Sequence, residues 1–456
     1  MDLREIAESI PDYPAFLTVD ELNASSHQLA EEFPDLVTIK VVGHTRAGDP
    51  IELITIHGGE LSAFVFGGPH PNEPIGCMTI EYLTRRLCED AKLRDELGYT
   101  WHFIKTIDSD GMRLNEGWFK GPYTPTHYAR NFFRPAPFDQ VEWTFPLQYK
   151  TLNFNSPLPE TQVLMNVIDE VKPTLLYSLH NAGFGGVYYY TSGGDEALFK
   201  LFREIPEWYD LALDLGEPEA SYAKTLAPAV YESLSAKDGY DHLLANGVED
   251  PASVMNSGGS SAEYVEKYGS HFLIVELPYY EDPRVTDLSP STTSRREAII
   301  QGLDQQEVSE SWLEAKLALV NPLLTQETLI TRAVNAFISM GASYRAAERQ
   351  WALTSPDTER MATNAEVFSA VLGTRFYRLL IFGMFVRLLG AEIASGNTHA
   401  DLVETHSQAL ARFDESSADL ESKLNYRALP VRSLVGVQVC AGLATAAYLR
   451  DKKAGS

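Results

Sequence analysis

The chain has 456 residues, more than one small domain needs, because domains usually run to about 100–200 residues. Hydrophobic residues make up 44% of it, which supplies a sizeable core and excludes wholesale disorder. It carries 37 Lys and Arg against 63 Asp and Glu, a formal net charge of −26 at pH 7. Such an acidic surface repels phosphate backbones and anionic lipids, so we expect no nucleic-acid partner and no membrane-surface role.

The N-terminal segment MDLREIAESIPDYPAF is acidic and lacks the apolar stretch of a secretory signal. The three cysteines, Cys77, Cys88 and Cys440, are scattered and indicate no disulfide framework, as is typical of a reducing compartment. The longest apolar stretches, Leu379–Leu389 and Leu434–Leu449, fall short of the roughly 20 residues that a membrane span needs. We therefore expect buried helices there, no membrane segment, and a soluble cytoplasmic protein.

Four short apolar runs in the first 280 or so residues predict buried strands. They are compact, rich in β-branched or aromatic residues and bounded by turn residues. The runs are Ala63–Phe66, Trp101–Ile107, Thr174–Leu179 and Phe272–Leu277. A helix from Pro74 to about Asp90 is predicted between the first two, because Ile80, Leu83 and Leu87 recur at helical spacing. Strands alternating with helices around one core indicate an α/β fold.

The sequence pattern changes near Ser289–Arg296, and beyond it almost every pattern is helical. One apolar stripe runs from Leu329 to Ile338 at helical spacing. We expect two units, an α/β domain over residues 1–290 and an all-helical C-terminal region over residues 291–456. The second unit is expected to pack on the first or to mediate self-association, and a homo-oligomer formed through it is left open.

Chemically active side chains follow three of the predicted strands, at the point where each strand ends. His70 and Glu73 form an HxxE motif after the first strand. His180 comes directly after the third strand, and Glu276 lies at the end of the fourth. Alone, each signal is weak, because HxxE occurs by chance and a lone buried His or Glu is usually structural. Ligand sites in open α/β sheets lie beyond the carboxyl ends of strands, so we expect these four side chains to converge.

Two histidines and one carboxylate are the usual protein ligands of a catalytic zinc ion, which keeps its fourth position for water. On this reasoning His70, Glu73 and His180 would bind one Zn²⁺ ion. Glu276 would then act as the general base that takes a proton from the water. The donor set of two nitrogens and one oxygen favours zinc as the metal.

Over roughly residues 15 to 280, the sequence resembles the M14 (carboxypeptidase A-like) zinc metallocarboxypeptidases. Besides the HxxE motif, His44–Ile51 looks like the family's Ser-x-x-Gly-Arg-x-Ile motif, and Ile107–Arg113 looks like its Asn-Pro-Asp-Gly turn. Leu158–Thr161 is similar to the family's Pro-Glu-Thr element, and Gly258–Ser260 to its GGS element. The resemblance implies a carboxypeptidase-like mixed β-sheet flanked by helices, one zinc ion on the HxxE motif and the distant His, and Glu276 as the base.

The resemblance also implies the substrate contacts. The family's Asn-Arg-Asn motif matches YARNFF, where Arg130 would hold a free C-terminal carboxylate and Asn131 would lie beside it. A guanidinium group suits this task because its planar fork binds a carboxylate with two hydrogen bonds. The alternative for Arg130 is a structural ion pair. Ser261 stands where side-chain preference is often set, and Arg113 or Arg134 would polarise the scissile carbonyl group.

These observations favour a zinc-dependent hydrolase that removes a C-terminal amino acid from a peptide or small amide with a free carboxylate. A first alternative is a zinc-dependent deacylase or amidase that acts on a small N-acyl amino acid or a modified peptide. It stays open because Val254 replaces the family's mobile Tyr and Ser261 supplies neither a charge nor a large apolar wall. A second alternative is a non-catalytic metal-binding assembly protein, although a complete set of ligands and base is usually catalytic.

Overall fold

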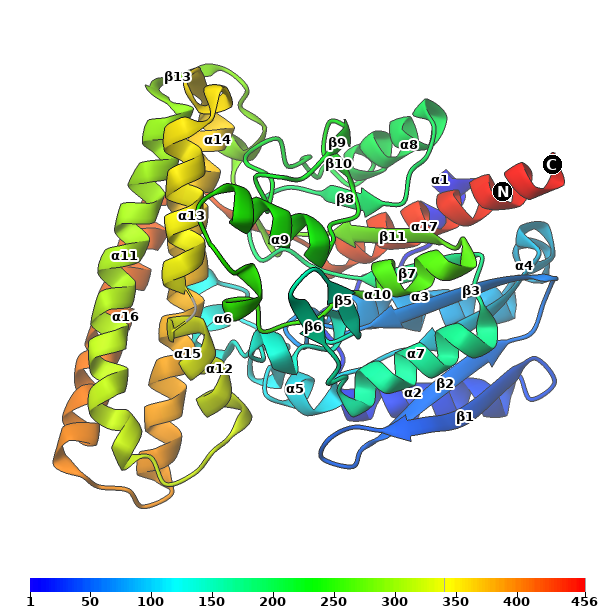
Figure 1. The fold of residues 1–456 in the computed structure, drawn as a ribbon. Helices are drawn as coiled ribbons and strands as arrows, with labels where there is room; N and C mark the ends of the chain where they lie inside the picture. Colours follow the sequence, from blue (N-terminus) through cyan, green and yellow to red (C-terminus); the bar gives the residue numbers. More distant parts are fainter. Residues whose placement is uncertain (340, 456) are drawn as a thin grey trace.

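The computed structural model describes residues 1–339 and 341–455. Figure 1 shows a twisted sheet with helices on both faces, and beside it a group of long helices from the C-terminal third of the chain. The strand pattern predicted an α/β fold and the family resemblance implied a mixed sheet flanked by helices, and both predictions are confirmed.

The main sheet has nine strands in the order β1-β2-β4-β3-β7-β11-β8-β10-β9. Their bounds are β1 (Val37–His44), β2 (Pro50–Ile56), β3 (Leu61–Gly67), β4 (Tyr99–Ile104), β7 (Leu175–Leu179), β8 (Tyr188–Thr191), β9 (Thr225–Ala227), β10 (Val230–Glu232) and β11 (His271–Glu276). The four predicted strands are β3, β4, β7 and β11, and they form the parallel centre of the sheet. Their carboxyl ends therefore meet at one edge.

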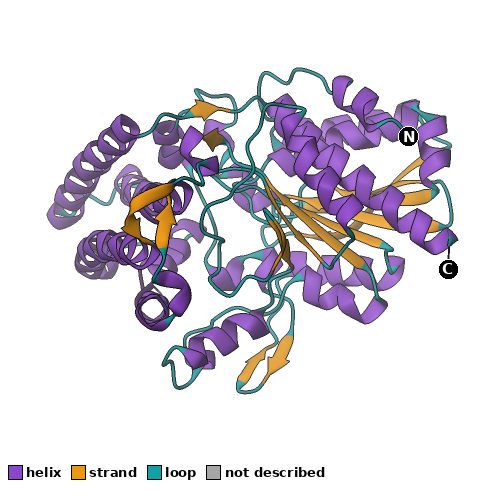
Figure 2. Ribbon diagram, turned by 90° about the horizontal axis from the view of Figure 1, so that it is seen from above, coloured by secondary structure: helices purple, strands orange, loops and turns teal. Residues whose placement is uncertain are grey.

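Helices cover the sheet on both faces, as Figure 2 shows from above. On one face α3 (Ile75–Glu89) and α17 (Val431–Ala454) pack together, flanked by α2 (Val19–Glu32) and α8 (Glu196–Glu207). On the other face α7 (Pro159–Val171) and α10 (Ser261–Val265) close a separate apolar cluster against β3 and β7. Burial on both sides explains why β3 and β7 are buried along most of their length without alternation, whereas β4 alternates through Thr100 and His102.

Helix α3 corresponds to the helix predicted from Pro74 to about Asp90, with Pro74 at its N-cap. A glycine in its first turn allows an unusually close contact with the sheet. A Cβ atom on Gly76 would lie 2.5 Å from the Cβ atom of Leu179, the last residue of β7. Because glycine has no Cβ, the turn between β3 and α3 can lie directly beside the end of β7.

The C-terminal region contains the predicted helices. Its helices are α11 (Arg295–Val320), α12 (Leu329–Ser339), α13 (Gly341–Thr354), α14 (Asn364–Phe368), α15 (Thr374–Ala394) and α16 (Ala400–Lys423). It is not all helical, because β14 (Met361–Thr363) pairs with β13 (Pro290–Ser294), and β15 (Arg427–Ala428) pairs with β12 (Tyr280–Glu281). Strands of two or three residues are too short to show an alternating pattern in sequence.

Helix α17 contains the apolar stretch Leu434–Leu449 and lies along the sheet, against α3, α8, β7 and β11, rather than with the other C-terminal helices. It is the one described helix long and apolar enough to cross a membrane, and 83% of its most apolar window is buried in the protein. This is the burial of a core helix, as the sequence predicted. The remaining helices and strands are α1 (Leu3–Glu8), α4 (Ala91–Leu97), α5 (Ser109–Arg113), α6 (Pro125–Asn131), α9 (Ala236–Ala245), β5 (Leu147–Tyr149) and β6 (Leu152–Phe154).

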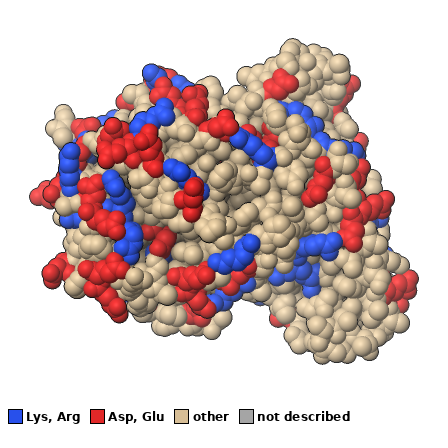
Figure 3. Space-filling view, turned by 180° about the vertical axis from the view of Figure 1, so that it is seen from behind, with Lys and Arg blue, Asp and Glu red and all other residues tan. Residues whose placement is uncertain are grey.

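The surface reflects the negative net charge of the chain. On the face that Figure 3 shows, acidic side chains are interspersed with basic ones, and the described residues of that face form no continuous basic area. A basic stripe of the kind that follows a phosphate backbone is therefore missing from this face.

Candidate metal centre

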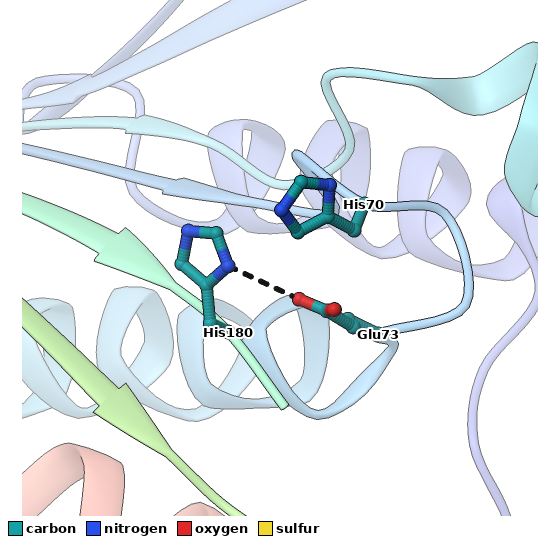
Figure 4. A group of neighbouring side chains, drawn as sticks. All are labelled: His70, Glu73 and His180. Carbon is teal, nitrogen blue, oxygen red and sulfur yellow. Dashed lines mark ion pairs between the residues drawn. The ribbon is translucent and has the colours of Figure 1, made fainter. Parts of the chain in front are cut away.

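Three potential metal ligands converge at the carboxyl edge of the parallel strands. His70 and Glu73 lie in the turn between β3 and α3, and His180 directly follows β7. Gly67 of β3 is paired with Leu179 of β7, so the two segments leave the sheet side by side. Each of the three side chains is buried and offers a ligand atom, and these atoms all lie within 4.8 Å of one another (Figure 4).

The ring of His180 is held so that one nitrogen faces Glu73. Its Nδ1 atom lies 3.2 Å from Glu73 Oε2, the contact drawn as a dashed line in Figure 4. Its Nε2 atom lies 2.8 Å from the hydroxyl oxygen of Ser178. When one imidazole nitrogen binds a metal, a hydrogen bond to the other nitrogen fixes the orientation of the ring. Ser178, bonded to Nε2, is therefore suited to hold Nδ1 of His180 toward Glu73.

His70 carries a buried nitrogen with an unmet bonding need. Its Nδ1 atom has no hydrogen-bond partner among the described residues, and its ring centroid lies 4.9 Å from that of His180. Burial, reinforced by the nearby Arg134 and His180, lowers the pKa of His70 well below its usual value of 6.5. The imidazole is therefore neutral and keeps the lone pair that binds a metal. An orphaned buried nitrogen beside a carboxylate fits a zinc ion.

Glu276 lies at the end of β11, which neighbours β7, as the sequence predicted. Its Oε1 atom is 3.9 Å from His180 Nδ1, and its side chain is buried. Burial raises the pKa of Glu276 well above its usual value, and the carboxylates of Glu219 and Glu73 raise it further, whereas Arg134 opposes the shift. A carboxylate in this place is within reach of a water molecule held between the three other side chains.

Two of the sequence-predicted substrate residues, both in helix α6, have protein partners instead. The Arg130 guanidinium pairs with Asp414 of α16 and lies over the ring of Phe413. The Asn131 amide donates a hydrogen bond to the carbonyl of His127 within the same helix. The structure thus gives Arg130 the structural ion pair that was the alternative to its predicted contact with a substrate carboxylate.

Arg113 and Ser261 are engaged as well. Arg113 pairs with Asp20 and Asp49 at the surface. Ser261 is fully buried, and both its backbone N–H and its hydroxyl donate to Glu142. Ser261 therefore presents no free group to a substrate in this arrangement, and Arg113 lies with surface carboxylates.

The segment Asp139–Trp143 contacts the candidate ligands and was missed by sequence reasoning. The side chain of Gln140 accepts a hydrogen bond from Arg134, and the Trp143 ring centroid lies 5.4 Å from that of His70. Glu142 is buried, and burial raises its pKa. The sequence does contain a signal here, because Asp139, Gln140 and Glu142 fall within five positions. Three polar side chains this close together can be buried only when each has a hydrogen-bond partner.

Arg134 lies at the candidate metal centre, in contrast to Arg113. Its Nη1 atom donates to Glu73 Oε1 at 2.9 Å, its Nε donates to Gln140 at 3.0 Å, and its guanidinium lies over the Trp143 ring. Of the two arginines proposed from the sequence to polarise a carbonyl group, Arg134 is the one beside the ligands.

Four tyrosines on either side of Val254 in the sequence occupy different places in the structure. Tyr279 reaches the HxxE turn, where its hydroxyl donates to the carbonyl of Asn72 at 2.8 Å. Tyr240 and Tyr264 instead bond to residues outside the turn, Thr151 and Asp169 respectively, and Tyr280 is buried among aromatic rings. Val254 itself packs in a small apolar cluster.

Comparison with known proteins gives similarities to carboxypeptidases. The chain is 26% identical to carboxypeptidase B of Astacus astacus over 105 residues, which are 22% of this chain and 35% of that protein. The match thus spans about a third of that relative's length. Among solved structures, a metallo-carboxypeptidase from Burkholderia cenocepacia is 14% identical, with a TM-score of 0.37, over 57% of this chain and 60% of the other. Carboxypeptidase A from Helicoverpa armigera is also 14% identical, with a TM-score of 0.38, over 77% and 79%.

A family model also matches more than half of the chain. It describes the zinc carboxypeptidases, the M14 peptidases, and aligns with residues 22–270. The matched segment runs from α2 to the residue before β11, and so it contains both the HxxE turn and His180. The chain therefore belongs to the M14 family of zinc carboxypeptidases.

Proposed function

We propose that this protein is a zinc-dependent carboxypeptidase that hydrolyses the last peptide bond of its substrate and releases the C-terminal amino acid. One observation carries the proposal: the ligand atoms of three buried side chains lie within 4.8 Å of one another, with Glu276 Oε1 3.9 Å from His180 Nδ1. Two imidazoles, a carboxylate and a separate carboxylate beside them suit metal-assisted hydrolysis.

His70, Glu73 and His180 would hold a single zinc ion. When bound, zinc acts as a Lewis acid and lowers the pKa of an attached water to about 7. The protein contributes the preset donors: His70 keeps its lone pair because it is neutral, and Ser178 turns Nδ1 of His180 toward Glu73. Burial of all three excludes competing solvent ligands.

Glu276 accepts the proton of the attacking water and passes it to the leaving amine. Arg134, held beside Glu73 by hydrogen bonds, is placed to donate to the oxygen that becomes negatively charged during the attack. These roles divide the work between a base on β11 and a cation on the loop after α6.

The variant Glu276→Gln tests this proposal, because it keeps the size of the side chain and removes the base. We expect zinc content to stay at one ion per chain by elemental analysis, while release of the C-terminal amino acid, followed by mass spectrometry, falls at least about 1,000-fold. Glu404→Gln, at an exposed site on α16, is the matched control and should keep full activity. Turnover by Glu276→Gln at the wild-type rate would contradict the assignment.

The substrate panel separates the carboxypeptidase from the two alternatives. Peptides with a free C-terminus should be cleaved much faster than their C-terminal amides. Faster cleavage of N-acyl amino acids than of peptides would favour the deacylase, and no hydrolysis by the zinc-loaded protein would favour the assembly protein.

We also propose that residues 1–290 carry the reaction and that residues 291–456 assist it. The protein would work in the cytoplasm, where its three buried, unpaired cysteines would stay reduced.

A further inference from the structure

Ser178 is a polar residue in an apolar part of the sheet. It lies in β7 between Phe66 of β3 and Ile274 of β11, and it has no exposed surface. Because successive side chains of a strand point to opposite faces, Ser178 shares a face with Leu176, which packs in the apolar cluster that α7 and α10 close. A hydroxyl buried at such a place needs hydrogen-bond partners.

The hydrogen bonds of Ser178 run in one direction, away from the candidate metal centre. His180 Nδ1 is the ring nitrogen that faces Glu73 (Figure 4), and a metal ligand presents its lone pair there. A neutral imidazole then carries its proton on Nε2, which donates to the Ser178 hydroxyl oxygen at 2.8 Å. The hydroxyl hydrogen needs a different acceptor. Among the described residues, the other partner of this hydroxyl is Glu142 Oε2, at the long distance of 3.5 Å.

The Glu142 carboxylate is held on its other side by Ser261. Its Oε1 atom accepts two hydrogen bonds from this serine, one from the backbone N–H at 3.0 Å and one from the hydroxyl. Two donors on Oε1 leave Oε2 as the oxygen that faces Ser178. The carboxylate is buried, so bulk water does not compete for the serine.

The backbone that carries Glu142 is held at two further points. Two residues later, the hydroxyl of Thr144 shares a hydrogen bond of 2.6 Å with the hydroxyl of Thr161 in α7. Three residues earlier, Asp139 accepts two hydrogen bonds of 2.7 Å from Arg332 of α12. These contacts fix the position of the carboxylate independently of the candidate ligands.

We propose that Glu142 is a positioning residue of the metal centre, which acts through Ser178 to hold Nδ1 of His180 toward the metal and the ring proton on Nε2. The proposal rests on the proposed function, because it concerns a zinc ligand of the same site. An anionic acceptor behind the serine makes its oxygen a stronger acceptor, and the imidazole in turn a more basic ligand. Ser261, expected from the sequence to face the substrate, would serve the metal centre instead.

The variant Glu142→Gln tests the proposal at an unchanged side-chain size. When the amide oxygen stays with the two donors of Ser261, the amide NH₂ group faces Ser178 and donates where the wild type accepts. We expect zinc affinity, measured by competition with a fluorescent chelator, to fall about 10-fold. This is the lower end of the range for an outer partner of a ligating histidine, as suits a long hydrogen bond. The visible spectrum of the Co²⁺-loaded protein should change too, because it depends on ligand geometry.

A double variant decides whether Glu142 acts through Ser178. Ser178→Ala alone should weaken zinc binding about 10-fold or more. Glu142→Gln added to Ser178→Ala should then cost less than about threefold further affinity, because residues of one network are not additive. Two losses that multiply in the double variant would overturn the proposal, and so would a Glu142→Gln protein with the zinc affinity of the wild type.

Glu366→Gln is the matched control for the loss of a buried carboxylate. Glu366 belongs to α14 and accepts hydrogen bonds from Arg360 and from the backbone of Thr363. This variant should lower stability in urea and leave zinc affinity unchanged. If Glu142→Gln fails to fold, Glu142→Asp decides, since it keeps the charge and shortens the reach to Ser178. Wild-type zinc affinity in Glu142→Asp would overturn the proposal.

The zinc measurement keeps this inference distinct from the proposed reaction. A wild type that binds zinc and hydrolyses no peptide overturns the reaction, whereas non-additive losses of zinc affinity in the double variant still support the role of Glu142. An active wild type whose zinc affinity is unchanged by Glu142→Gln keeps the reaction and overturns the inference.

Discussion

Gln438 connects the last helix to the candidate metal centre, and its removal is the strongest test of how the site is supported. The side chain is fully buried in α17. Its Nε2 atom donates to the backbone carbonyls of His180, at 2.9 Å, and Val275, at 3.3 Å, and its Oε1 atom accepts from the hydroxyl of Thr79 at 2.7 Å. One amide therefore links α17 to α3, to the backbone of the candidate ligand His180 and to the residue before Glu276.

The variant Gln438→Met keeps the length of the side chain and removes all three hydrogen bonds. Each bond contributes about 1 kcal/mol, and the partners stay buried without a replacement, so we expect the free energy of unfolding to fall by about 2–4 kcal/mol. The backbone carbonyl of His180 also loses the hydrogen bond that holds it in place, which should weaken zinc binding about 10-fold or more. Urea denaturation measures the first effect, and competition with a fluorescent zinc chelator measures the second.

The matched control is Gln408→Met on α16, where the amide bonds to Glu404 at the surface. Its stability should change by less than about 0.5 kcal/mol, as is usual for exposed substitutions. A loss below about 1 kcal/mol for Gln438→Met, together with unchanged zinc affinity, would refute the reasoning. It would show that the carbonyls find water or other partners when the amide is absent.

Two further predictions concern the elements that carry the site. Burial lowers the pKa of His271, at the start of β11, to about 4, against about 6.5 in an unfolded chain. As the pH falls below 6.5, the unfolded chain takes up a proton on His271 before the folded protein does, so the free energy of unfolding decreases by up to about 3 kcal/mol between pH 6.5 and pH 4. Urea denaturation at several pH values should show a weaker pH dependence of this free energy for His271→Gln than for the wild type. An equal pH dependence in the two proteins would contradict the prediction. Gly76→Ala places a methyl group 2.5 Å from Leu179 Cβ, so we expect a loss of about 1–3 kcal/mol, measured the same way, whereas unchanged stability would mean that α3 can shift freely.

The parts of the fold that sequence predicted are those set by local pattern. The central strands β3, β7 and β11 appear in the sequence as short apolar runs, and the four chemically active residues lie at or just after their ends. Convergence of His70, Glu73 and His180 then follows from parallel pairing alone, because neighbouring strands end at the same edge.

The parts that sequence missed depend on contacts between distant segments. The position of Arg130 was inferred from a short motif match, but its partner Asp414 lies in a helix far along the chain. Strand β14, which pairs with β13, has only three residues, too few for an alternating pattern. The contact of Trp143 with His70 joins irregular backbone to a turn, and neither segment has a periodic pattern in the sequence that could have predicted it.

The C-terminal residues meet the metal centre from two directions. Helix α17 packs on the sheet and bonds through Gln438 to the backbone of His180, whereas α13 and α15 line a cavity whose sheet side includes Ala182 and Tyr188. The ligands therefore come from the first 180 residues, but the polar support under one of them and one wall of the cavity come from beyond residue 340. Because these contacts join segments more than 150 residues apart in sequence, they form only when those distant segments have folded together. A metal ion bound at His70, Glu73 and His180 would stabilise that final state, and so zinc affinity and the docking of α17 should be linked.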